Sequence, residues 1–188
     1  MDALVMCGGE GTRLRPEYEA EKPLVDVGGI PMVDRVIEAL AASHADDVFA
    51  VVSPQTPATR SHLVDRGVAV IDAPGEGYVA DLQYALDRVE RPVLTAVADL
   101  PLLEPILVDR TLAVAGGGSL TVVVPAELKR RLGASADSAF ERDGREFAPT
   151  GLNVVGEADD ATYVSYDARL AVNVNRPSDV ELAAALCA

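Results

Sequence analysis

Near its amino terminus the chain reads Ala3-Leu4-Val5-Met6-Cys7-Gly8-Gly9-Glu10-Gly11-Thr12-Arg13. The apolar run at its start is short enough for a buried strand, and the glycines end that strand abruptly. Because glycine has no Cβ, the three glycines can take positive φ and point successive N–H groups into one concavity, where an anion binds. Arg13 then offers a fork of donors for phosphate oxygens, and Lys22 a mobile charge for a second phosphate. The stretch therefore predicts a phosphate-binding loop.

Two common glycine loops do not match this stretch. A P-loop ends in Gly-Lys-Ser/Thr, whereas Gly11 is followed here by Thr12 and Arg13. The dinucleotide fingerprint G-x-G-x-x-G would require a third glycine where the chain has Leu14. The loop must therefore belong to another class of phosphate-binding site.

Strand, polar loop and helix alternate after the first strand. Apolar runs predict strands, and segments with helical spacing predict helices. The strands are expected at 24–27, 48–52, 68–72, 93–97 and 120–124, and the helices at 31–40, 57–65, 78–89 and 106–114. This alternation indicates an α/β fold, a Rossmann-like three-layer sandwich with a mainly parallel central sheet. Since ligands bind outside the carboxyl ends of such strands, loops 8–13, 53–56, 73–78 and 99–101 are expected to converge.

The second half of the chain is less regular. We expect a short basic helix at 127–133, an excursion over the sheet edge at 134–147, and strands at 149–155, 162–166 and 170–174. Thr56 before Pro57 is typical of a helix N-cap. Ser178 and Glu181 have the spacing of a capping box, which predicts a terminal helix ending near Leu186.

Composition limits the classes of function. A chain of 188 residues, 49% of them hydrophobic, is expected to fold as a single domain over residues 1–188. The net charge of −14 and the isoelectric point near 4.4 argue against nucleic-acid partners, which require a basic patch. Without a membrane-length apolar run or a signal-peptide pattern, we expect a cytoplasmic protein with no membrane insertion. The diffuse acidity favours a halophilic protein, because salt screens its self-repulsion.

Asp99 is the candidate metal ligand. It ends the apolar run Leu94-Thr95-Ala96-Val97-Ala98, where a carboxylate has little structural reason to follow. Mg²⁺ commonly uses one or two protein carboxylates together with phosphates and water. We therefore expect Asp99 to hold Mg²⁺ on a bound phosphate, with Arg13 and Lys22 as the catalytic cations.

The pattern Gly-Gly-x-Gly-Thr-Arg with a downstream Lys22-Pro23 resembles the signature of nucleotidyltransferases. The chain is more closely similar to archaeal GTP:adenosylcobinamide-phosphate guanylyltransferases, which are related to molybdopterin guanylyltransferases. The segments that carry this resemblance are Ser53-Pro54-Gln55-Thr56-Pro57, Gly75-Glu76-Gly77-Tyr78, Leu152-Asn153-Val154-Val155 and Asn173-Val174-Asn175. It implies a fold of the nucleotide-diphospho-sugar transferase type. It also implies transfer of GMP from GTP to adenosylcobinamide phosphate, with release of pyrophosphate, in cobalamin biosynthesis.

The resemblance also implies roles for individual residues. Asn153 and Asn175 would bind the acceptor. The nucleotide-binding residues would be Gly8, Gly9, Gly11, Thr12, Ser53, Gln55, Thr56, Gly77 and Tyr78. Two assignments stay open, because Tyr78 could instead be a core tyrosine and Asn175 could ligate the metal through its carbonyl or cap the turn before the last helix.

Other functions fit the same pattern. A molybdopterin guanylyltransferase or a sugar-phosphate nucleotidylyltransferase would share the glycine loop and Asp99, and would differ only in the acceptor. A non-catalytic, nucleotide-binding regulatory subunit is an alternative of another class, against which the presence of Arg13, Lys22 and Asp99 argues. The sequence is also compatible with a homodimer.

Overall fold

The computed structural model describes residues 1–157 and 160–187, and it is built on one mixed sheet of eight strands. The strand order is β10-β7-β9-β6-β1-β4-β5, and β8 pairs with β9 beside this path. The strands are β1 (Ala3–Met6), β4 (Val48–Val52), β5 (Ala69–Asp72), β6 (Val93–Val97), β7 (Ser119–Pro125), β8 (Phe140–Arg142), β9 (Arg145–Val155) and β10 (Asp160–Val164). A separate hairpin contains β2 (Asp26–Val27) and β3 (Ile30–Pro31).

The sheet is mostly parallel. Strand β1 pairs in parallel with β4 and β6, β4 with β5, and β7 with β10. Among the strands of the described residues, only β9 interrupts this pattern, because it runs antiparallel to β6, β7 and β8. The predicted α/β class is confirmed, and the carboxyl ends of β1, β4, β5 and β6 lie at one edge of the sheet.

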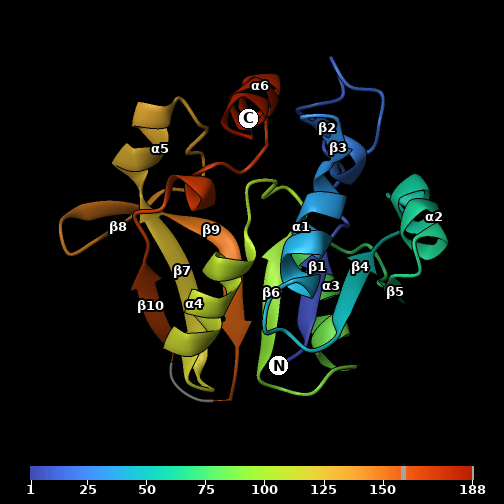
Figure 1. Ribbon diagram of the computed structural model, residues 1–188, viewed down its shortest axis with the longest axis horizontal. Helices are drawn as coiled ribbons and strands as arrows, with labels where there is room; N and C mark the ends of the chain where they lie inside the picture. Colours follow the sequence, from blue (N-terminus) through green and yellow to red (C-terminus); the bar gives the residue numbers. More distant parts are fainter. Residues whose placement is uncertain (158–159, 188) are drawn as a thin grey trace.

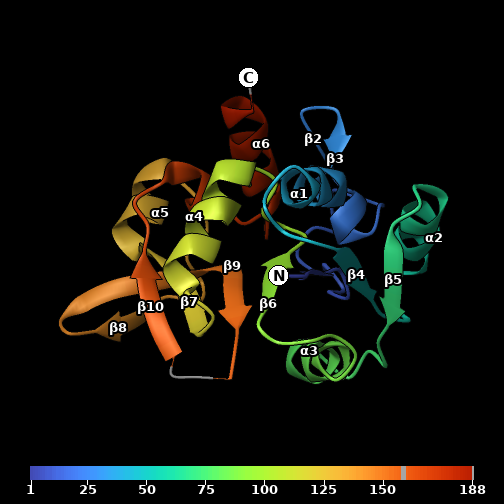
Figure 2. The same cartoon turned by 60° about the horizontal axis from the view of Figure 1, so that its bottom comes forward.

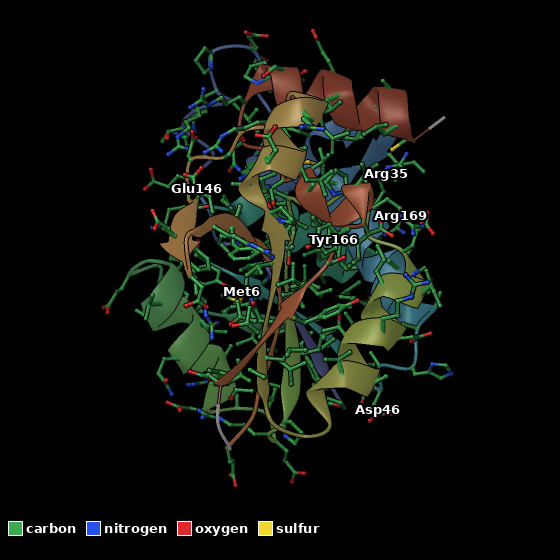
Figure 3. The ribbon with its side chains drawn as sticks, turned by 90° about the vertical axis from the view of Figure 1, so that its left-hand side faces the viewer. Met6, Arg35, Asp46, Glu146, Tyr166 and Arg169 are labelled. Carbon is green, nitrogen blue, oxygen red and sulfur yellow. The ribbon has the colours of Figure 1, made fainter. Side chains whose placement is uncertain are left out.

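Helices cover both faces of the sheet. They are α1 (Met32–Ala41), α2 (Pro57–Asp65), α3 (Tyr78–Leu86), α4 (Pro105–Ala115), α5 (Ala126–Leu132) and α6 (Pro177–Leu186), with 3-10 helices η1 (Lys22–Leu24) and η2 (Ala168–Ala171). In Figures 1 and 2, α3 lies on one side of the sheet and α1 and α4 lie on the other. The side view of Figure 3 shows the β8–β9 hairpin on the same side as α3.

The core follows the period-two alternation of the strands. In β1, Ala3 and Val5 join the cluster that contains α1 and α4, while Leu4 and Met6 join the cluster that contains α3. Both faces of β1 are therefore buried, as in a central parallel strand. Burial of Leu4, Val5 and Met6 stabilises the fold by about 1.5–3 kcal/mol each, and this holds the carboxyl end of β1 in place. None of the helices in the described residues is long and apolar enough to cross a membrane.

Two predicted strands are wrong. Residues 24–27 do not form one strand, because η1 precedes a hairpin whose two-residue turn, Gly28-Gly29, has positive φ at both positions, as type I′ turns require. Residues 170–174 lie partly in η2, which begins where the Asp167 carboxylate accepts a hydrogen bond from the Arg169 backbone N–H. The expected excursion at 134–147 contains β8 and the start of β9.

Two helix caps also differ from the prediction. Thr56 precedes α2, but its hydroxyl donates a hydrogen bond to the Ser53 carbonyl and does not cap the helix. The N–H groups of the first turn of α2 donate instead to the Glu21 carboxylate. Helix α6 begins at Pro177, one residue before the predicted cap. The carboxylate of Asp179 accepts hydrogen bonds there from the Asn175 and Arg176 N–H groups.

Candidate active site

A cavity of about 520 Å³ opens at the carboxyl edge of the parallel strands. Its walls come from the loops after β1, β4, β5 and β6, together with Lys22 and Pro23 of η1. The four loops that the sequence predicted to converge therefore meet at one site. The strand residues Met6, Val51 and Val97 form the floor, and Met6 and Val51 also pack in the α3 cluster, so the cavity lies on the α3 side of the sheet. Figure 3 labels Met6 there.

The glycine loop uses its glycines for close packing more than for positive φ. Only Gly11 has positive φ, at +63°, and a Cβ on it would lie 2.6 Å from the Lys22 Cβ. Gly8 instead lies against Ser53, whose hydroxyl donates to the Gly8 carbonyl at 3.1 Å. The expectation of positive φ at Gly8 and Gly9 is therefore wrong. The missing side chain at Gly11 lets Lys22 approach the loop.

A cluster of polar side chains lies beside the cavity, and two of its members, Lys22 and Asp99, line it. Lys22 Nζ donates to Asp99 Oδ2 and, at 2.9 Å, to Asn175 Oδ1. The other Asp99 oxygen accepts from Asn173 Nδ2 at 3.2 Å. The backbone joins the same residues, because the Val174 N–H donates to the Asp99 carbonyl at 2.9 Å. We call Lys22, Asp99, Asn173 and Asn175 the Asp99 cluster. It brings together residues from three distant parts of the chain.

Lys129 contacts the Asp99 cluster through Asn173. The sequence analysis did not identify Lys129 as a site residue. Its side chain is 3% exposed, and Nζ donates to Asn173 Oδ1 at 2.9 Å. Burial lowers the pKa of Lys129, while the charges of Asp99 and Asp179 oppose that shift. The sequence did contain an indication of this role for Lys129, because Lys22 and Lys129 are the chain's two lysines and both lie at this cluster.

The side-chain oxygens of Asp99 and Asn175 are suitable ligands for a divalent cation. Asp99 Oδ2 and Asn175 Oδ1 converge on one point, which the Lys22 ammonium now contacts. Within the described residues no group of three or more His, Cys, Asp or Glu side chains could hold a metal. One carboxylate and one amide oxygen suit Mg²⁺ that completes its shell with phosphate and water. This arrangement fits a metal shared with a substrate.

Gln55, Gly77 and Tyr78 line another wall of the cavity. Tyr78 is 48% exposed, so it is not a core tyrosine. The pKa of its hydroxyl is raised, first by loss of solvation and then by the Asp99 charge. Gln55 Nε2 donates to the Gly75 carbonyl at 3.0 Å. Asp81, which the sequence analysis did not single out, lines the same wall and is 4% exposed.

Several predicted residues lie outside the cavity lining and remain predictions. They are Gly11, Thr12, Arg13, Ser53, Thr56, Asn153 and Asn175. Arg13 is exposed and pairs with Asp137 at 2.9 Å. Ser53 and Thr56 are buried and bond each other. Asn153 lies in β9, opposite Thr95 of β6 and Thr121 of β7.

Comparison with known proteins gives consistent matches. Residues 3–179 match the family described as "MobA-like NTP transferase domain". The adenosylcobinamide-phosphate guanylyltransferase of Methanocaldococcus jannaschii is 35% identical over 105 residues, which are 53% of this chain and 52% of that protein. The match thus spans about half the length of that curated relative. The resemblance seen in the sequence is confirmed.

Solved structures agree on the fold. A transferase structure from Thermus thermophilus is 29% identical, with a TM-score of 0.62 over 82% of this chain and 64% of that one. A CMP:2-keto-3-deoxy-manno-octonic acid synthetase in complex with CTP has a TM-score of 0.69 at 15% identity, over 100% of this chain and 98% of that one. At that identity the second match bears on the fold alone.

Proposed function

Because this chain belongs to the MobA-like NTP transferase family, we propose that it transfers a nucleoside monophosphate unit from a nucleoside triphosphate to a phosphorylated acceptor. In the finer form of the proposal, GTP and adenosylcobinamide phosphate give adenosylcobinamide-GDP and pyrophosphate. The observation that carries the proposal is the cavity in which the glycine loop, Lys22 and Asp99 meet. The similarity to the methanogen guanylyltransferase supports the finer form.

The reaction needs no protein nucleophile. An oxygen of the acceptor phosphate, already ionised near neutral pH, attacks the α-phosphorus. The bond from that phosphorus to the oxygen bridging to the β-phosphate breaks, and pyrophosphate leaves with the electron pair. The protein must position the two reactants and neutralise charge. Lys22, at the cavity wall, is the cation for the departing phosphates.

Asp99 and Asn175 would hold Mg²⁺ at the point where their oxygens converge. The ion would neutralise phosphate charge. Lys22 would then turn from the two oxygens toward phosphate. Asn173 and Lys129 keep the Asp99 carboxylate in its orientation.

Arg13 is proposed to exchange its present partner for the triphosphate. Asp137 also accepts two hydrogen bonds from Arg176, at 2.8 and 3.1 Å, so it keeps a cationic partner if Arg13 leaves. The Arg13 and Asp137 side chains are 61% and 40% exposed, and such pairs contribute only about 0–1 kcal/mol. Breaking the Arg13–Asp137 pair therefore costs little free energy.

The remaining site residues have supporting roles in this proposal. Backbone N–H groups of Gly8 and Gly9 would contact the nucleotide, while Gly11, Thr12, Ser53 and Thr56 maintain the loops around it. Gly77 lets the chain turn into α3, and Tyr78 would stack on the base or ribose. Asn153 is on the cavity side of β9, in register with Thr95, and would contact the acceptor.

The test is pyrophosphate release from GTP and Mg²⁺ with each of three acceptors: adenosylcobinamide phosphate, molybdopterin and a sugar phosphate. We expect release with the first, and none from the Arg13→Ala protein, whose fold should be intact by circular dichroism. Release with a sugar phosphate or molybdopterin alone would overturn the choice of acceptor. Tight GTP binding with no release under any condition would identify a regulatory subunit.

A further inference from the structure

Asp81 is a buried carboxylate that the proposed chemistry does not use. It lies in the first turns of α3, and its Oδ1 accepts hydrogen bonds from the Gly75 N–H at 2.8 Å and the Glu76 N–H at 3.3 Å. Oδ2 accepts no hydrogen bond from the described residues. It points toward the glycine loop, 3.3 Å from where a Gly8 Cβ would lie. Asp81 is only 4% exposed and lines the cavity, so water has little access to its carboxylate and a ligand donor at Oδ2 would be favoured.

The same wall has a second unpaired acceptor. Gln55 Oε1 is buried and has no hydrogen-bond partner among the described residues. Gln55 and Asp81 flank Gly75, since one side chain bonds its carbonyl and the other its N–H. This wall of the cavity therefore presents more acceptors than donors. Such a wall matches a ligand edge that is rich in N–H groups.

Asp81 lies beside the glycine loop, because its Oδ2 is 3.3 Å from the position that a Gly8 Cβ would take. Gly8 follows β1, and Asp99 follows the neighbouring strand β6. The anionic triphosphate would be repelled by the Asp81 carboxylate and attracted by the Lys22 ammonium, which contacts Asp99. The base of a bound nucleotide would therefore face Asp81.

We propose that Asp81 Oδ2 accepts hydrogen bonds from N1–H and the 2-amino group of guanine, and that Asp81 selects guanine over adenine nucleotides. This inference rests on the proposed function. Guanine presents two donors side by side at N1 and N2, which one carboxylate oxygen can accept. Adenine presents an unprotonated N1 at the same place, and its lone pair would face the carboxylate. Discrimination then comes from repulsion as well as attraction.

The decisive variant is Asp81→Asn. Its amide oxygen can still accept from Gly75 and Glu76, while an NH₂ donor replaces Oδ2. Xanthine carries a carbonyl oxygen where guanine has its 2-amino group, so it can accept from that donor. We expect GTP affinity to fall on the order of 100-fold and the preference for GTP over XTP to fall at least about tenfold, because the new donor opposes both donors of guanine but only N1–H of xanthine. Partial unfolding would weaken the binding of both nucleotides alike, so it cannot produce this change in preference.

Calorimetry would measure the dissociation constants of GTP, XTP, ITP and ATP. The matched control is Asp87→Asn, which changes an exposed carboxylate at the other end of α3 and should leave the preference unchanged. An Asp81→Asn protein that folds and keeps the wild-type preference for GTP over XTP would overturn the inference.

A measurement on the unmodified protein makes the test independent of any variant. N1-methyl-GTP lacks the N1 proton, and we expect it to bind at least about tenfold more weakly than GTP. Equal binding of the two nucleotides would overturn the role of Asp81. If pyrophosphate is released from GTP while this discrimination is absent, only the inference fails. If the protein binds no nucleoside triphosphate, the proposed function fails.

Discussion

Removal of the Glu21 carboxylate should loosen helix α2 and the segment that carries Lys22. Glu21 Oε1 accepts from the Ala58 N–H at 2.9 Å, and Oε2 accepts from the Thr59 N–H and hydroxyl, both at 2.7 Å. These bonds replace the cap that Thr56 does not provide. They also connect the residue next to Lys22 to an element 37 positions away.

The loss in the free energy of unfolding for Glu21→Ala follows from these contacts. A hydrogen bond to a charged group contributes about 1.5–3 kcal/mol, and water can replace Glu21 only at the exposed Ala58 N–H. Thr59 is fully buried, so its two donors lose their partner without compensation. We expect a loss of about 2–4 kcal/mol in the free energy of unfolding. For a chain of this size the melting temperature should fall by about 4–16 °C.

Urea denaturation of Glu21→Ala and of the control Glu19→Ala would measure this difference. Glu19 is exposed, and its loss should change stability by less than about 0.5 kcal/mol. A double-mutant cycle with Thr59→Val should give a coupling of about 1 kcal/mol. Pyrophosphate release should also fall, because Lys22 would lose its support. The reasoning is refuted if Glu21→Ala is as stable as Glu19→Ala.

Three further predictions follow from single contacts. Gly151→Ala should destabilise the fold by about 2–5 kcal/mol in urea, since φ is +83° and a Cβ would lie 2.3 Å from Val97 Cγ2; an unchanged midpoint would contradict this. Hydrogen bonds from Arg169 (labelled in Figure 3) hold the pKa of Asp167 below its usual range, so its contribution is present above about pH 4 and is lost as pH falls. Asp167→Asn should therefore lower the melting temperature at pH 7 but hardly at pH ~2, and an equal effect at both would show that the charge does not matter. Asp99→Ala should keep the fold while pyrophosphate release falls on the order of 100-fold, and wild-type release would exclude Asp99 from the chemistry.

The local sequence pattern was sufficient to predict the strands that form the parallel half of the sheet. Strands β1 and β4 are continuous apolar runs, and β6 is apolar except for Thr95. Glycine or a polar residue follows each of them within two positions, and a strand buried on both faces requires an apolar run of this kind. The alternation with helices then implied that the strands are parallel and that their loops meet. Gly8 and Asp99 could be placed near each other on that basis alone.

Contacts between distant segments could not be read in the same way. The antiparallel insertion of β9 between β6 and β7 depends on which strands find each other, and no local pattern encodes that choice. Hydrogen bonding by Glu21 and burial of Lys129 likewise involve partners 37 to 44 residues away.

Residue types and spacing were thus enough to indicate an α/β fold with an anion-binding loop, because strand periodicity and glycine stereochemistry act over a few neighbouring residues. The identity of each side chain's partner was settled by three-dimensional packing. Asp81 is the clearest case, since its sequence position marks only an acidic residue early in a helix. Only the folded chain brings one of its oxygens to two loop N–H groups and leaves the other without a donor at the cavity.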